Sequence, residues 1–280
     1  MTTAVKPERV SPGGLAHELR AATMVWRREM IRFRHDSTRV AAMLLQPLLF
    51  LFIMGTGLSS LVQSEGEVDF RTFLFPGVLV IAVLFSAAFA GISLVWDREF
   101  GFLREMLVAP VGVSAIIIGK CMGGATVATA QSVVILALAG VVGVPYDPLL
   151  LLQLLGLLFV AAFMLTALGV LLSARIKQIQ AAMPTLQLIL MPMMFLSGAL
   201  FPMANLPSWL AVTTKLNPLT YVVQPMRTLV LDRLGVSDAA LDPSVTWWGW
   251  QVPLPLQVCV AIAFTAGLVA VAVAAFDRTE

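Results

Sequence analysis

The sequence predicts an all-α membrane protein with six transmembrane helices, and three observations lead to this fold class. Of the 280 residues, 59% are hydrophobic and only 12% are charged, whereas a soluble domain has about 25% charged residues. Six apolar runs each come near the roughly 20 residues that a helix needs to cross a bilayer. Lysine and arginine gather in alternate connecting segments, which is typical of loops on the cytoplasmic side of a membrane.

The first part of the chain is predicted to lie on the membrane surface. We assign residues 1–38 to a solvated tail and an amphipathic helix, and residues 39–280 to the transmembrane domain. One helical stripe of this helix is apolar: Leu15, Leu19, Ala22, Trp26, Met30 and Phe33. Arginines flank the stripe, and such a helix rests among the lipid headgroups. Such a helix anchors the chain to the membrane surface.

The six predicted spans follow in order along the chain. They cover residues 40–61, 73–95, 114–142, 149–173, 181–200 and 251–276. Pro47 is expected to kink the first span, and Pro184 and Pro192 to kink or break the fifth. The glycine pair Gly119 and Gly123 predicts close packing of the third span against a neighbouring helix.

The distribution of positive charge predicts that both termini are cytoplasmic. The N-terminal segment holds eight lysines and arginines, and positive residues recur after the second span, after the fourth span and at the C-terminus. The loop after the first span has only Arg71 beside three acidic residues, and residues 143–148 have none. Segment 201–250 is predicted to be external although it contains Lys215, Arg227 and Arg233, because long loops follow the charge rule poorly.

The segment from Trp96 to Lys120 is predicted to contain a short helix that does not cross the membrane. At 100° per residue, one arc is mainly polar: Asp97, Arg98, Gly101, Arg104 and Glu105. The opposite arc is apolar except for Glu99: Phe100, Phe102, Leu103, Met106 and Leu107. Pro110 and Gly112 are expected to end the helix. Being too short to span, it must lie against lipid or against a protein.

The segment after the fifth span is apolar but too interrupted to form a span. Four prolines divide it, namely Pro202, Pro207, Pro218 and Pro225. We expect one or two short helices that enter the outer leaflet and return, since re-entrant backbone must be buried in protein or line a cavity.

Several kinds of chemistry are disfavoured by what the spans contain. No acidic residue is expected deep in a span, and Lys120 is expected to reach the cytoplasmic surface with its flexible side chain. An intramembrane enzyme or an ion-coupled carrier usually needs buried ionisable groups. The sequence also has no G-x-x-x-x-G-K-[ST] phosphate loop, so we expect no ATP hydrolysis on this chain. Methionines around the fifth span fit either an adaptable apolar cavity or ordinary core filling.

Two motifs resemble those of ABC-2 type permeases, the membrane subunits of bacterial ABC exporters, and most of all the permeases of daunorubicin-type drug-resistance exporters. The first motif is an acidic and basic start, a glycine, an apolar helix with a methionine and a V/A-P stop; its residues here are Asp97, Arg98, Glu99, Gly101, Leu103, Met106, Ala109 and Pro110. Gly119-Lys120 follows where the family often has a Gly-Lys pair. The second motif, F-P…L-P…NP-x-(T/S)-Y…R, matches Phe201-Pro202, Leu206-Pro207, Asn217 to Tyr221, and Arg227.

The resemblance implies that the N-terminal amphipathic helix is a connecting helix along the inner leaflet, with a simple anchor as the alternative. It also implies roles for both motif segments. The first is implied to be a coupling helix docked on an ATPase subunit, through Asp97, Arg98, Glu99, Phe100, Gly101, Leu103, Arg104 and Met106. The second is implied to be an external re-entrant gate, with Phe201, Pro202, Pro207, Asn217, Pro218, Tyr221 and Arg227. The alternatives are an interfacial helix that only anchors a loop, and a structured loop cap without a gating role. Glu99 needs a cationic or donor partner, either on the ATPase subunit or at a neighbouring helix end.

The expected function is therefore that of a transport subunit rather than an enzyme. The resemblance implies a bacterial plasma membrane protein that pairs with an ATPase subunit carrying ATP and Mg, and with a second copy or a paralogous permease. Membrane lipids are further expected partners; nucleic acid is not, and no cofactor or metal is expected on this chain. The expected substrate is an amphipathic drug, antibiotic or lipid moved outward. Export of a polysaccharide or glycolipid and a scaffold role without transport are the alternatives.

Overall fold

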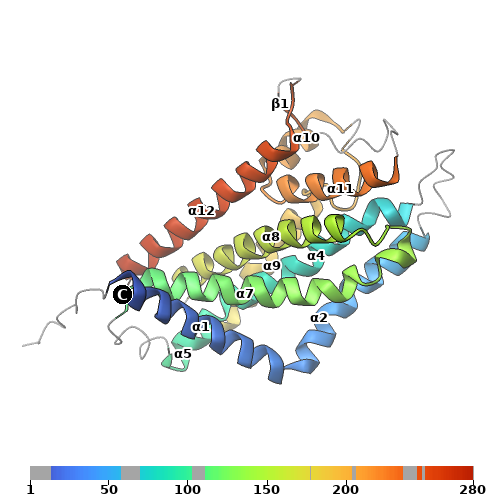
Figure 1. The fold of residues 1–280 in the computed structure, drawn as a ribbon. Helices are drawn as coiled ribbons and strands as arrows, with labels where there is room; N and C mark the ends of the chain where they lie inside the picture. Colours follow the sequence, from blue (N-terminus) through green and yellow to red (C-terminus); the bar gives the residue numbers. More distant parts are fainter. Residues whose placement is uncertain are drawn as a thin grey trace, which may run out of the picture.

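The computed structural model describes residues 14–57, 70–102, 111–176, 178–203, 206–235, 245–247 and 250–279, and these ranges are mostly helical (Figure 1). The elements, in chain order, are α1 (Leu15–His35), α2 (Ser37–Leu49), the π-helix η1 (Phe50–Met54), α4 (Phe70–Ile92), α5 (Leu94–Glu99), α7 (Val113–Leu136), the 3₁₀-helix η2 (Ala139–Val142), α8 (Pro148–Arg175), α9 (Ile179–Phe195), α10 (Ser208–Leu216), α11 (Thr220–Leu234), β1 (Thr246–Trp247), β2 (Trp250–Gln251) and α12 (Leu254–Thr279).

Five helical segments among the described residues are long and apolar enough to cross a membrane. They are Val40–Gly57, Phe70–Glu99, Val113–Leu136, Pro148–Arg175 and Leu254–Asp277. The predicted fifth span corresponds to α9, which has 17 residues and ends before a turn at Gly198, where φ is +70°. An all-α membrane protein is therefore confirmed, whereas six spans remain a prediction.

Prolines and glycines change the predicted helix bounds. Helix α2, which begins the first span, continues as the π-helix η1 from Phe50, three residues after Pro47. This change in helix type fits the local disturbance of backbone hydrogen bonding that an internal proline causes. Helix α9 continues through both Pro184 and Pro192, so the break that we allowed for is absent. Helix α7 ends at Leu136 instead of residue 142, because the chain turns there through η2 to Gly143, where φ is +80°.

Helices α4, α7 and α8 form the centre of the molecule. The most apolar stretch of α4 is 83% buried, whereas that of α12 is only 11% buried. Gly91 of α4 and Gly169 of α8 let the two backbones pack directly against each other, because an added Cβ would collide with Thr166 O and with Ala88 O, respectively. Any larger residue at either glycine would force α4 and α8 apart. Helix α12 packs on α8 at the periphery (Figure 1).

Helix α1 packs lengthwise against the first half of α7. The two glycines predicted to pack closely do so here, since a Cβ on Gly119 would lie 2.5 Å from Ala22 O and one on Gly123 would lie 2.7 Å from the Cβ of Glu29. Leu15 and Leu19, at the start of the predicted apolar stripe, are 85% and 68% exposed. The stripe is thus covered by the described chain only in its second half.

The connecting segments divide between two ends of the molecule as the charge pattern predicts. The starts of α1, α7 and α9, the ends of α8 and α12, and all of α5 lie at one end (Figure 1). Helices α10 and α11 and the hairpin of β1 and β2 lie at the other (Figure 1). The cytoplasmic position of the first end remains a prediction.

The segment after α9 forms two short helices, α10 and α11, as the sequence suggests. The inner face of α11 is buried against α4, α8 and α12. The small antiparallel hairpin, in which Thr246 pairs with Gln251, was not predicted. A re-entrant position in the outer leaflet remains a prediction.

Candidate functional site

The charged end of α5, residues Asp97 to Glu99, is the centre of the site. Helix α5 has six residues and ends at Glu99, followed by Phe100 and by Gly101 with φ of +82°, a conformation that suits glycine after a helix. The prediction of one amphipathic helix running on from Asp97 is therefore wrong at its start, because the chain leaves the helix at Gly101. The predicted residues Leu103, Arg104 and Met106 lie outside the described residues.

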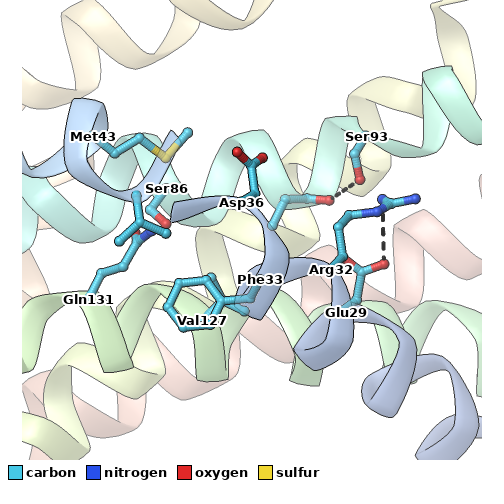
Figure 2. A pocket seen from close by; sticks show the side chains of 11 residues that line it. Glu29, Arg32, Phe33, Asp36, Met43, Ser86, Ser93, Val127 and Gln131 are labelled. Atoms are coloured by element: carbon cyan, nitrogen blue, oxygen red, sulfur yellow. Dashed lines mark hydrogen bonds and ion pairs between the residues drawn. The ribbon is translucent and has the colours of Figure 1, made fainter. Parts of the chain in front are cut away.

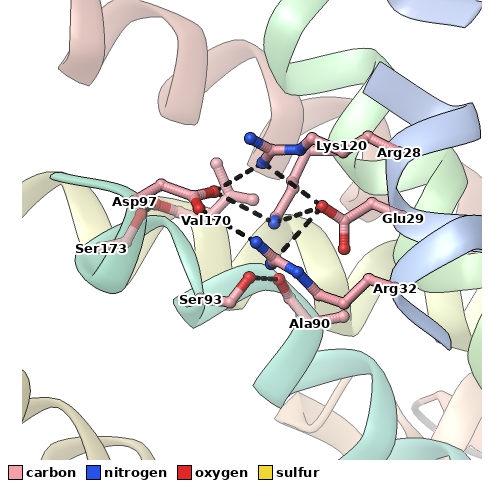
Figure 3. Close-up of polar contacts among 9 residues, drawn as sticks. All are labelled: Arg28, Glu29, Arg32, Ala90, Ser93, Asp97, Lys120, Val170 and Ser173. Carbon is pink, nitrogen blue, oxygen red and sulfur yellow. Dashed lines mark hydrogen bonds and ion pairs between the residues drawn. The ribbon is translucent and has the colours of Figure 1, made fainter. Parts of the chain in front are cut away.

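Asp97 is buried within ion pairs instead of facing solvent from a polar arc. Its carboxylate lies 2.7 Å from Arg28 Nη2, 3.3 Å from Arg32 Nη2 and 3.6 Å from Lys120 Nζ. Figure 3 shows these side chains converging on it from α1 and α7. We call Arg28, Glu29, Arg32, Asp97 and Lys120 the charge cluster. The three cations of the cluster that pair with Asp97 are distant from it in sequence, so helical periodicity alone did not reveal them.

Glu29 supplies the second carboxylate of the charge cluster. Its Oε1 accepts a hydrogen bond from Lys120 Nζ at 2.8 Å and lies 3.5 Å and 3.8 Å from the guanidinium groups of Arg28 and Arg32. Burial alone would raise the pKa of Glu29, but Lys120 and the two arginines more than offset it and hold the pKa below its usual range. Glu29 is therefore ionised at neutral pH.

Lys120 is the most deeply buried member of the charge cluster, with 1% of its side chain exposed. The expectation that it reaches the membrane surface is thus wrong. Two carboxylates lie within 4 Å of its ammonium group and compensate its charge inside the protein. Since the cluster holds three cations and two carboxylates, its formal charge is +1; the two arginines, 34% and 43% exposed, face its open side.

Arg98 connects α5 to the end of α8 and to α12. Its Nη1 donates hydrogen bonds to Ser173 O at 2.8 Å and to Ile176 O at 3.2 Å, and its guanidinium lies 5.7 Å from the centre of the Phe276 ring. The last carbonyls of a helix lack partners within the helix, so a cation there is favourable.

Glu99 connects α5 to the start of α9. Its Oε2 accepts a hydrogen bond from Ile179 N at 3.1 Å, and a helix start favours an anion. Of the two kinds of partner left open for Glu99, the structure shows the neighbouring helix end. Glu18 makes the equivalent contact at the start of α7, where Gly112 N donates to both carboxylate oxygens at 3.0 and 3.1 Å.

Two aromatic side chains follow the charged end of α5 and face outward. Phe100 is 68% exposed and Phe102 is 52% exposed. Apolar side chains of this size beside a turn favour contact with lipid or with another protein. The surface available to a partner therefore begins at Phe100, since the three preceding residues contact their own chain.

At the opposite end of the molecule, Arg227 of α11 is 1% exposed and binds backbone carbonyls. Its Nη2 donates to Gly198 O at 3.0 Å and Ala199 O at 3.2 Å, and its Nε donates to Phe73 O at 3.4 Å. Its guanidinium also lies 3.9 Å from the centre of the Phe73 ring. Arg227 thereby joins α11 to the turn after α9 and to the start of α4.

The NP-x-T-Y part of the second motif connects α9, α10 and α11. Asn217 Nδ2 donates to Met193 O at 2.6 Å, while Asn217 Oδ1 accepts from Leu219 N at 3.0 Å. Tyr221 donates its hydroxyl to Lys215 O at 2.9 Å, satisfying a carbonyl near the end of α10. These contacts fit the structured loop cap that we kept as an alternative, and a gating role stays a prediction.

The remaining predicted residues of this segment make less specific contacts. Phe201, Pro202 and Pro218 are half-buried, and Pro207 is exposed where it precedes the first residue of α10. The hairpin adds Trp247, whose Nε1 donates to the Tyr221 hydroxyl at 2.9 Å. Its position relative to Tyr221 was not predicted from the sequence.

Sequence reasoning missed Glu29, although a signal for it exists. The residues Ala22, Trp26 and Phe33 follow helical spacing, and position 29 falls on the same seam. A carboxylate on an apolar seam needs a partner, and that is the role of Lys120 here. Within the ranges that the structure describes, no three His, Cys, Asp or Glu side chains are grouped closely enough to hold a metal ion.

Comparison with known proteins defines the family. The family model described as "ABC-2 type transporter" matches residues 20–231, which include α5, the charge cluster and the NP-x-T-Y motif. The chain therefore belongs to the ABC-2 type transporter family, whose members are membrane components of ABC transport systems that include an ATPase.

Individual relatives carry transport names. A protein named as the transport permease ycf38 of Cyanophora paradoxa is 30% identical, over 72% of this chain and 71% of its own. Nodulation protein J of Rhizobium leguminosarum bv. trifolii is 27% identical, over 74% of this chain and 80% of its own. A protein named as the multidrug ABC transporter permease YbhR of Escherichia coli K12 is 28% identical, over 65% of this chain and 48% of its own. The chain is thus a transport permease subunit.

Proposed function

We propose that this permease is the membrane subunit of an ATP-driven exporter that moves an amphipathic substrate, such as a drug, an antibiotic or a lipid, out of a bacterial cell. In this proposal the segment from Asp97 to Met106 is the coupling segment. The ATPase subunit, which carries ATP and Mg, contacts it from Phe100 onward. A second copy or a paralogous permease completes the transporter. The name of the Escherichia coli relative supports a role in drug efflux.

The observation that carries the proposal is that three consecutive charged residues join the coupling segment to separate helices. Asp97 pairs with α1 and α7, Arg98 binds the end of α8, and Glu99 binds the start of α9. Because α5 is short and nearly continuous with α4, a displacement at Phe100 acts on four neighbouring helices through polar contacts. This is the arrangement that converts ATPase closure into a movement of the transmembrane helices.

The outer end of the pathway is proposed to be closed by the segment Phe201–Arg227. Arg227 supports this role because it binds the turn after α9 and the backbone of α4 together. Helix α4 begins next to Arg227 and is followed directly by α5. A movement of α4 would therefore be transmitted to both ends of the molecule.

The test is reconstitution in inside-out membrane vesicles with the ATPase subunit that co-purifies with the chain. We expect ATP-dependent uptake of an amphipathic fluorescent drug and no uptake with a non-hydrolysable nucleotide. Uptake of a labelled polysaccharide or glycolipid instead would favour the alternative substrate class. Absence of any co-purifying ATPase would contradict the proposal and favour a scaffold without transport.

A further inference from the structure

The side of α1 that points away from α7 carries three arginines in line. Arg20, Arg27 and Arg34 recur every seventh residue, so at 100° per residue they fall within about 40° of arc on the helix. At 1.5 Å per residue they extend over about 21 Å of its length. All three side chains are exposed. We call this set of residues the arginine row.

The opposite side of α1 is occupied by the protein itself. Ala22 and Glu29, about 140° and 160° around the helix from Arg27, contact two glycines of α7. Trp26 Nε1 donates to the Thr126 hydroxyl of the same helix at 3.1 Å. Figure 2 shows the end of this inward side, where residues of α1 and α2 line a small pocket against α4 and α7. The second half of the apolar stripe therefore faces the protein, and the arginine row is the side left open.

The two carboxylates of α1 do not neutralise the arginine row, because both bind on the inward side. Glu18 accepts hydrogen bonds from Gly112 N, and Glu29 pairs with Lys120. The guanidinium groups of the row form no ion pair or hydrogen bond with any residue that the structure describes. The row is thus a line of three positive charges that the described chain leaves uncompensated.

Exposed apolar side chains lie between these arginines. Met24 is 66% exposed and Ile31 is 53% exposed, and both fall within about 60° of Arg27 around the helix. A helix face that combines cations with apolar side chains fits the boundary between lipid headgroups and acyl chains. There the arginines reach the phosphates, while the apolar side chains enter the edge of the hydrocarbon.

The connection to the first span holds the arginine row close to the bilayer. Helix α1 ends at His35, and α2 begins at Ser37. The first candidate span begins at Val40, six residues after Arg34, and only 17% of it is buried inside the protein. Basic clusters directly before a transmembrane helix, or on an amphipathic helix, are typical binding sites for anionic lipids.

We propose that the arginine row binds the phosphate groups of anionic phospholipids in the adjoining leaflet. The uncompensated charge selects an anionic headgroup over a zwitterionic one, and a guanidinium matches phosphate oxygens with two donors at once. The intervening Met24 and Ile31 and the nearby span favour lipid over the acidic surface of a protein. Because Glu29 ties the other side of α1 to α7, lipid and protein hold this helix from opposite sides.

The inference goes beyond the proposed function and does not depend on it, since lipid binding needs neither ATP nor a transported substrate. The experiment is a lipid titration of the full chain, purified in detergent, followed by native mass spectrometry. One arm adds phosphatidylglycerol and the other adds phosphatidylcholine with the same acyl chains. We expect phosphatidylglycerol to bind at least about 10-fold more tightly.

Glutamine substitutions locate this preference on the arginine row. Arg20→Gln, Arg27→Gln and Arg34→Gln should each weaken phosphatidylglycerol binding about fivefold, the contribution of one basic residue near anionic lipid. The triple glutamine variant should bind the two lipids nearly alike. The triple lysine variant keeps the charges and should still prefer phosphatidylglycerol. Arg175→Gln is the matched control, because Arg175 is a single exposed arginine at the end of α8, and it should bind lipid like wild type.

Thermal unfolding in detergent shows whether the variants fold. The triple glutamine variant should melt like wild type, because the described chain offers its three arginines no partner to lose. Equal affinity of the wild type for both lipids would overturn the inference, as would an undiminished preference in the triple glutamine variant. An equal loss in Arg175→Gln would also overturn it. If the triple glutamine variant kept its lipid preference but no longer retained the co-purifying ATPase, the row would be a protein-docking surface instead.

Discussion

Glu29 Oε1 and Lys120 Nζ lie 2.8 Å apart across 91 positions of the sequence, and both side chains are more than nine-tenths buried. Their ion pair joins α1 to α7 beside Gly123, where the missing side chain lets the two helices pack closely. Asp97 adds α5 to the same contact. The N-terminal helix, predicted as a surface element, is therefore joined to α7 and α5 by buried ion pairs.

The first prediction concerns this ion pair. Lys120→Met removes the central cation and leaves two buried carboxylates with only the partly exposed arginines, so we expect a loss of about 3–5 kcal/mol in stability. Glu29→Gln should also destabilise, but the double variant Glu29→Gln/Lys120→Met should lose less than the sum of the two. Thermal unfolding of the purified protein in detergent measures all three.

The matched control for the buried Glu29–Lys120 ion pair is an exposed ion pair at the other end of the molecule. Arg233 Nη1 lies 2.6 Å from Asp147 Oδ2, with side chains 41% and 27% exposed, and Arg233→Met should cost only about 0–1 kcal/mol. Strictly additive losses in the Glu29/Lys120 cycle would show that the two residues act independently, contrary to the structure.

The second prediction concerns Arg227 at the opposite end. Arg227→Lys keeps the charge but cannot reach three backbone carbonyls at once, because an ammonium group lacks the planar fork of a guanidinium. We expect destabilisation of about 1–3 kcal/mol, the usual cost of leaving buried carbonyls without a donor. Thermal unfolding of Arg227→Lys beside Arg233→Lys, an exposed arginine on the same helix, measures it. Equal melting temperatures for these two variants would contradict the assigned contacts.

The sequence predicted those features that depend on local pattern. Hydropathy located the buried α4, and the Gly119/Gly123 pair located a close helix contact. The prolines and the NP-x-T-Y motif correctly indicated short helices α10 and α11. In each case the physical cause lies within a few residues, so it can be recognised without knowing the fold.

The features that were missed depend on partners distant in sequence. A helical wheel places Asp97 on a polar arc, but Arg28 approaches it from 69 positions away and turns that arc inward. The same applies to Lys120, for which a long side chain at a helix start suggested the membrane surface. Only the fold shows that two carboxylates make its burial favourable.

The third prediction concerns membrane topology. In a background with Cys121 and Cys259 replaced by serine, single cysteines at Glu67 and Thr279 should react with a membrane-impermeant maleimide from opposite sides, because the loop after the first span is poor in positive charge. Intact cells should label the Glu67→Cys variant, and inverted vesicles the Thr279→Cys variant. Labelling of both from the same side would rule out the five spans that the prediction places between these two positions.

The last prediction concerns Glu99. Glu99→Gln keeps the side-chain shape, and its amide oxygen can still accept from Ile179 N, but the charge that favours the start of α9 is lost. Such an exposed contact contributes only about 0.3–1 kcal/mol, so folding and membrane insertion should be unaffected. Under the proposed function, however, α9 is moved by the coupling segment through this contact. We therefore expect substrate-stimulated ATP hydrolysis by the assembled complex to fall several-fold.

Asp147→Asn provides the control for Glu99→Gln. Asp147 likewise accepts a hydrogen bond at a helix start, from Leu149 N at 2.8 Å, but it lies at the end of the molecule away from α5. It should cost similar stability while leaving stimulated ATP hydrolysis near the wild-type rate. If both variants reduced the stimulation equally, the effect would come from helix stability. If Glu99→Gln hydrolysed ATP like wild type in an intact complex, Glu99 would be a surface carboxylate without a part in coupling.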